Sequence, residues 1–67
     1  MTYREEIQLM IKQLQDVYDK ANQLRDHALL EDKEFFNKVR EVLPYAWKPL
    51  QKLDNSMSDN QAKMLID

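Results

Sequence analysis

Glycine is absent from this chain of 67 residues, and that absence limits both its backbone geometry and its chemistry. Loops that cradle phosphate groups need glycine, because the backbone must approach the ligand closely at positive φ. The P-loop and the dinucleotide-binding fingerprint are therefore excluded, and the nucleophile elbow and the EF-hand loop lack their glycines too. Tight β-hairpins prefer Asn-Gly or Asp-Gly turns, and no segment alternates apolar and polar residues over the length of a strand. The sequence therefore predicts an all-α fold.

The length allows one small domain, which we take to be residues 1–67. A chain this short builds a marginal core, and small domains usually add disulfides, a structural metal or self-association. There is no cysteine and only one histidine, so neither a disulfide nor a cysteine zinc site can form. Tight helix packing and oligomerisation remain as ways to stabilise the domain. The absence of cysteine also fits a cytoplasmic protein.

The N-terminal segment, about residues 3–30, has the pattern of a long amphipathic helix. Thr2 and Glu5 form a Thr-x-x-Glu capping box, which satisfies free amide groups at a helix start. Ile11 and Tyr18 widen the apolar stripe beyond the seam of a two-stranded coiled coil, so a helical bundle is favoured. The seam itself alternates spacings of four and three. It consists of Tyr3, Ile7, Met10, Leu14, Val17, Ala21, Leu24 and Ala28.

A second helix is expected over about residues 33–43, with Asp32 as its N-cap. The alternative is one unbroken helix, because Phe35 and Val42 continue the seven-residue register of the seam. An unbroken helix would be a rod much longer than the compact diameter of about 28 Å for a chain of this size. The favoured arrangement is therefore a helical hairpin that reverses just before Asp32.

Two prolines interrupt the pattern after the second helix. Proline lacks an amide donor and disfavours α geometry at the preceding residue. Pro44 therefore predicts that the helix ends, and residues 44–49 are expected to form a bent connection. Pro49 suits the first position of a helix, so a short helix is expected over about residues 49–55.

The last expected element is a short helix over about residues 59–66. Ser58 and Gln61 repeat the capping-box pattern at its start. An isolated helix of that length is not stable in water. It is therefore expected to dock on the hairpin or on a partner.

The expected second helix is too short to cover the first, so the N-terminal half of the seam would lie in water. Pairing with a second copy would cover it and complete a helical bundle. We therefore expect a homodimer. The expected self-association residues are Tyr3, Ile7, Met10, Leu14 and Val17.

No constellation in the sequence supports catalysis, a metal site or a cofactor. His27 and Glu31 are four residues apart and could share a helix face, but two ligands are too few for a metal. The acidic residues Glu31, Asp32 and Glu34 suit a helix start better than a catalytic carboxylate pair. The chain is therefore expected to be a non-enzyme without a cofactor.

Basic and aromatic residues are interleaved over residues 33–52, a mixture that can bind single-stranded nucleic acid. The net charge of the chain is −2, whereas nucleic-acid binders usually carry a pronounced basic excess. Nucleic acid is therefore an alternative partner only. A membrane is not expected, because no apolar run approaches the roughly 20 residues of a spanning helix. The basic residues are Lys33, Lys38, Arg40, Lys48 and Lys52.

Tyr45 and Trp47 are the best candidates for contacting a partner. Tyrosine and tryptophan dominate binding hot spots, and a loop stiffened by proline presents them at a low entropic cost. The competing interpretation is that Trp47 folds back onto the open end of the hairpin. We expect a small protein–protein interaction module, acting as a regulator, inhibitor or assembly factor for a larger protein. A nucleic-acid-associated regulator and a purely structural homo-oligomer are the alternatives.

Overall fold

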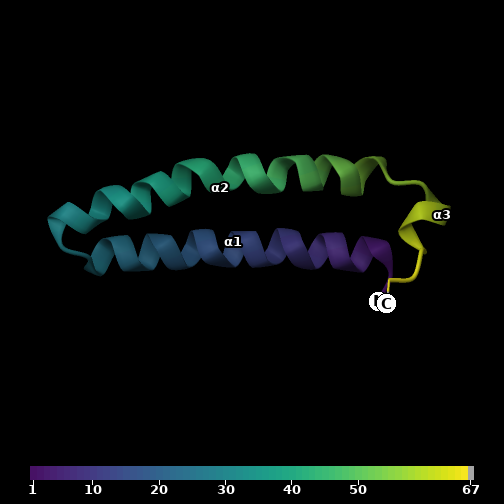
Figure 1. Cartoon of the computed structure of the whole chain (residues 1–67), viewed down its shortest axis with the longest axis horizontal. Helices are drawn as coiled ribbons and strands as arrows, with labels where there is room; N and C mark the ends of the chain where they lie inside the picture. Colours follow the sequence, from purple (N-terminus) through teal and green to yellow (C-terminus); the bar gives the residue numbers. More distant parts are fainter. Residues whose placement is uncertain (67) are drawn as a thin grey trace.

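Two long antiparallel helices, closed at one end by a short third helix, make up the computed structural model, which describes residues 1–66 (Figure 1). Helix α1 spans Tyr3–His27, α2 spans Leu30–Ser56 and α3 spans Asp59–Ala62. The molecule is flat and elongated, with principal extents of 49, 19 and 14 Å. The all-α hairpin expected from the sequence is therefore confirmed.

The start of α1 is fixed by the expected capping box. The Thr2 amide donates to the Glu5 carboxylate over 2.9 Å, and the Glu5 amide donates to the Thr2 hydroxyl over 3.3 Å. The backbone hydrogen bond first, and then the hydroxyl, favour the ionised carboxylate and lower the pKa of Glu5. Arg25 and His27 lie in the last turn, where positive charge interacts favourably with the helix dipole.

The chain reverses at Ala28 and Leu29, earlier than the sequence predicts. Both residues have extended backbone angles, and no described residue has positive φ, so the reversal is made without the left-handed conformation that glycine favours. The Leu29 carbonyl accepts from the Asp32 and Lys33 amides over 2.9 and 3.1 Å. Asp32 is therefore not the N-cap but lies in the first turn of α2, where its negative charge still favours the helix dipole.

Helix α2 continues through both prolines, so the predicted helix end at Leu43, the bent connection at 44–49 and the separate helix at 49–55 are wrong. Pro44 and Pro49 each remove one backbone hydrogen bond, and the ribbon of α2 is bowed (Figure 1). The helical geometry persists because it brings one row of apolar side chains onto α1. That row contains Phe36, Leu43, Trp47, Leu50 and Leu53.

Helix α3 ends at Ala62, which is shorter than the predicted 59–66. The Ser58 hydroxyl accepts from the Gln61 amide over 3.2 Å, so the predicted cap at its start is present. The chain beyond α3 is extended because it pairs with the N-terminus. The Tyr3 amide donates to the Met64 carbonyl over 2.7 Å and the Ile66 amide to the Met1 carbonyl over 3.0 Å. This pairing satisfies an amide of the first turn of α1 and brings the segment after α3 alongside the start of the chain (Figure 1).

The core lies at the end of the hairpin opposite the turn, beneath α3. Ile7 and Ile11 of α1 pack there with Met57 and Ala62, and Tyr3, Trp47, Leu50 and Leu53 surround them. Arg4 joins the two long helices at this end. Its guanidinium donates to the Asp54 carboxylate over 3.1 Å and to the Asp54 carbonyl over 3.0 Å. That carbonyl is one of the last four of α2, which have no partner within the helix.

The seam of α1 is divided between two sides of the helix. Ile7 and Ala21 are buried against the rest of the chain, together with Ile11 from the flank of the seam. Met10, Val17 and Leu24 are exposed. The apolar stripe is therefore wider than one neighbouring helix can cover, which is the pattern of a helix in a bundle.

Candidate interaction surface

One broad side of the hairpin carries two parallel rows of exposed apolar side chains, which we call the apolar face. Members of each row are seven residues apart, so they lie on one side of their helix. All members of the two rows are exposed, and five of the six keep 43 to 71% of their surface accessible. The rows are Met10, Val17 and Leu24 on α1, and Phe35, Val42 and Pro49 on α2.

A shallow apolar groove joins the two rows near the middle of the hairpin. Val17, Ala21 and Leu24 line it from α1, and Phe36 and Val39 line it from α2. Lys20 lies at its rim. Because Val39 is four residues after Phe35 and three before Val42, the α2 row borders this same groove. The two rows and the groove therefore form one continuous surface.

The opposite broad side is built from aromatic and polar side chains. The Tyr18 and Trp47 rings meet edge to face, with centroids 5.4 Å apart and planes at 82°. The Arg40 guanidinium lies 5.5 Å from the centroid of the Tyr18 ring. Tyr18 and Arg40 line a shallow hollow with Asn37 and Glu41. The two broad sides thus differ in character, and only the first is apolar along its whole length.

Arg40 is held inside this cluster rather than presented to solvent. Its Nε atom is buried without a hydrogen-bond partner among the described residues. The Tyr18 ring below the guanidinium supplies a cation–π contact in place of a carboxylate. Arg40 therefore acts here as a packing residue of the hairpin.

The predicted self-association residues fall into two groups. Ile7 is buried, Tyr3 packs against the core cluster and Leu14 is half-buried. Met10 and Val17 are exposed on the apolar face. The length mismatch behind the prediction does not exist, because α2 is as long as α1 and covers it from end to end. Dimerisation stays a prediction. Of the residues expected to take part in it, only Met10 and Val17 are exposed for such a contact.

The structure separates the two predicted partner-binding residues. Trp47 packs against Tyr18 and the core cluster, so the second interpretation of this residue fits its position better. Tyr45 is 78% exposed on the outer side of α2. The loop that would have presented them together is helix, so no stiffened aromatic loop exists.

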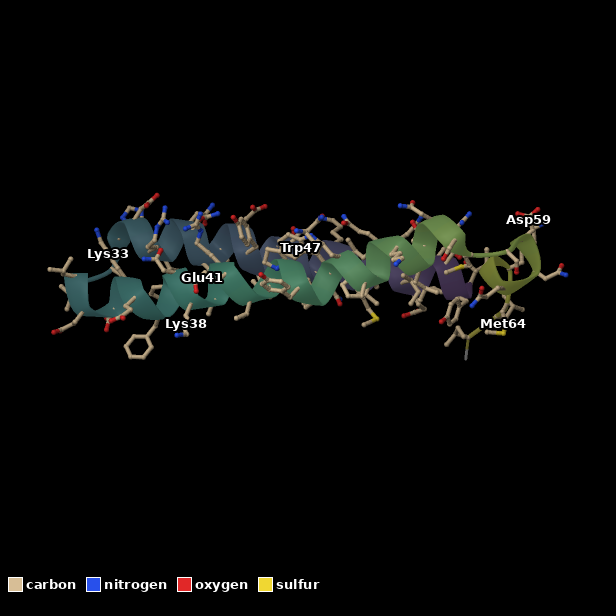
Figure 2. All side chains as sticks on the ribbon, turned by 90° about the horizontal axis from the view of Figure 1, so that it is seen from above. Lys33, Lys38, Glu41, Trp47, Asp59 and Met64 are labelled. Atoms are coloured by element: carbon tan, nitrogen blue, oxygen red, sulfur yellow. The ribbon has the colours of Figure 1, made fainter. Side chains whose placement is uncertain are left out.

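The basic residues of 33–52 do not gather into one surface. Arg40 is turned towards Tyr18. Lys33 lies near the turn, and Lys38 projects from α2 on the side away from α1 (Figure 2). Glu34 and Glu41 are exposed on the same helix as the exposed lysines. The arrangement is a solvated face of mixed charge, and it favours no nucleic-acid site.

The described residues offer neither a metal site nor a membrane-spanning helix. Among residues 1–66, no group of three or more histidine or acidic side chains could hold a metal ion. His27 ends α1 whereas Glu31 lies in the first turn of α2, so the two do not share a helix. None of the described helices combines the length and hydropathy that crossing a bilayer requires.

Comparisons with protein-family models, with curated proteins and with solved structures find no match for this chain.

Proposed function

We propose that this chain is a small non-enzymatic protein–protein interaction module that works by burying its apolar face against another helical surface. The observation that carries the proposal is the pair of apolar rows that the hairpin leaves uncovered. Large exposed apolar patches on small proteins mark interaction sites. A role as regulator, inhibitor or assembly factor in the cytoplasm is consistent with this surface.

The recognition chemistry of the apolar face is that of helix packing. Apolar side chains at spacings of three, four and seven fit the grooves of a facing helix. Covering one half-exposed side chain of this size contributes about 1 kcal/mol. Phe35 is the most exposed member and is the natural anchor of the α2 row.

Photo-cross-linking in cells tests this function. A photoreactive phenylalanine analogue at Val17 or Val42 would lie on the apolar face, whereas the same group at exposed Asp19 would point away from it. We expect protein adducts from positions 17 and 42 and none from position 19. Absence of adducts at 17 and 42, or the same adducts from all three positions, would contradict the proposal.

A further inference from the structure

We propose that the occupant of the apolar face is a second copy of this chain, lying antiparallel on it about a two-fold axis that runs across both helices at Val17 and Val42. This inference rests on the proposed function, because it names the partner of the same face. The size of the face, the symmetry of its rows and the charges along its edges carry it.

The broad side is large enough for a stable dimer. Extents of 49 by 19 Å enclose a rectangle of about 900 Å², which bounds the area that one copy can offer, and each partner in a standard interface contributes roughly 800 Å². The isolated hairpin also lacks a fully buried core, because no large side chain among residues 1–66 is fully buried. A second hairpin on the apolar face would supply the missing half of a four-helix core.

The two apolar rows share one centre of symmetry. Arg4 contacts Asp54 and Arg40 lies over Tyr18, so in this part of the hairpin residues lie side by side when their numbers add up to about 58. Val17 is the middle of its row and Val42 is the middle of the other. Their numbers add up to 59, so they lie nearly side by side by this register. One two-fold axis that crosses both helices at these residues therefore places each middle residue against its own copy.

The same axis brings the outer members of each row opposite one another. Met10 of one copy meets Leu24 of the other, and Phe35 meets Pro49. The second pairing sets a large ring against a compact one, which helps facing layers to interdigitate. The first pairs an unbranched and a branched side chain of similar volume.

The edge of α1 beside its apolar row carries complementary charges under the same axis. Glu6, Gln13, Lys20 and His27 follow one another at spacings of seven and so share this edge. Antiparallel pairing of α1 with its own copy sets Glu6 against His27 and Gln13 against Lys20. Neither pairing opposes like charges.

The corresponding edge of α2 gives the same result independently. Glu31, Lys38, Tyr45 and Lys52 are exposed and also follow at spacings of seven. The axis sets Glu31 against Lys52 as an ion pair and Lys38 against the Tyr45 ring as a cation–π pair. This pairing places Tyr45, an exposed aromatic residue of the hairpin, in a contact.

The other two-fold arrangement is disfavoured by charge. A copy docked with its α1 over α2 would oppose residues whose numbers add up to about 58. That pairs Glu6 with Lys52, but it also sets Lys20 against Lys38. The two-fold axis repeats that like-charge contact, and juxtaposed like charges oppose association. This like-charge contact, which the first arrangement lacks, favours the arrangement in which each helix lies on its own copy.

Disulfide trapping tests the axis directly, since the chain contains no cysteine of its own. Val17→Cys and Val42→Cys each place two sulfurs on the axis, within the range of about 4 Å between Cβ atoms that a disulfide spans. Mild oxidation should convert each variant almost completely to a covalent dimer. Helix content in the reduced state shows that each variant folds.

Two controls make the trapping specific. Met10→Cys alone should remain monomeric on oxidation, but mixed with Leu24→Cys it should give a covalent heterodimer. Asp19→Cys should give no rapid dimer. Failure of both axial variants to cross-link, or cross-linking only in a mixture of Val17→Cys with Val42→Cys, would overturn the proposed axis.

Charge exchange tests the register by a second route. Glu31→Lys should weaken the dimer by on the order of fivefold, because two edge pairs are lost per dimer. The double variant Glu31→Lys with Lys52→Glu should restore it. These residues are about 31 Å apart along one helix at 1.5 Å per residue, so restoration requires a second copy. A double variant as weak as the single one would contradict the register.

Sedimentation equilibrium of the wild-type chain separates this inference from the proposed function. A mass of two chains at micromolar concentration is expected. A folded monomer would overturn the dimer, and adducts with a different protein from positions 17 and 42 would then still support an interaction module. A folded monomer without such adducts would overturn both.

Discussion

Single residues decide which aromatic side chains hold the hairpin and which remain at the surface. Trp47 and Tyr45 are two positions apart on α2, yet the first packs against Tyr18 and the second is exposed. The difference follows from helical geometry, because neighbours two positions apart point in very different directions. A tyrosine and a tryptophan so close in sequence are typical of a binding hot spot. A hot spot needs both side chains on one surface, however, and these two lie on different sides of α2.

Truncation of the two aromatic residues should therefore have unequal effects. Trp47→Ala should lower the free energy of unfolding by about 2 kcal/mol, since it removes a half-buried ring and its edge-to-face contact. Tyr45→Ala should change the stability of the monomeric hairpin by no more than about 0.5 kcal/mol. Urea unfolding followed by circular dichroism, at a protein concentration where sedimentation shows the chain to be monomeric, measures both. Equal losses for the two variants would contradict the assigned positions.

Among the helices, α1 could be predicted from the sequence along nearly its whole length, whereas α2 is predicted only as two separate pieces. The capping box and the unbroken seam of α1 act in the same direction, so local signals and packing agree. In α2 they conflict: two prolines oppose the helix, while the row from Phe36 to Leu53 requires it. Tertiary packing wins, because each proline costs one hydrogen bond whereas a break would remove several side chains from α1.

Replacing the first of these prolines tests that explanation. Pro44→Ala restores an amide that can donate to the Arg40 carbonyl and relieves the clash with it. We expect stability to rise by about 1 to 2 kcal/mol after allowance for the greater freedom of the unfolded chain. The midpoint of urea unfolding gives the result. A loss of stability would instead mean that packing on α1 requires the bend at Pro44.

The whole molecule buries few side chains and leaves a broad apolar face on the outside. Four of its five buried residues cluster under α3, whereas Met10, Val17 and Leu24 and the α2 row lie on the outside. The sequence identifies these α1 residues as members of an apolar seam. It does not show which part of the seam the second helix covers, because that depends on the length of α2 and the register of the hairpin. The apolar face is therefore a property of the folded chain.

Thermal unfolding at different protein concentrations tests most directly whether the hairpin depends on a covered apolar face. Stability that comes from association varies with concentration by mass action. A hundredfold dilution should lower the unfolding midpoint of the purified chain by about 5 to 10 °C. The same midpoint at both concentrations would contradict the account, since the hairpin would then be stable with its apolar rows in water.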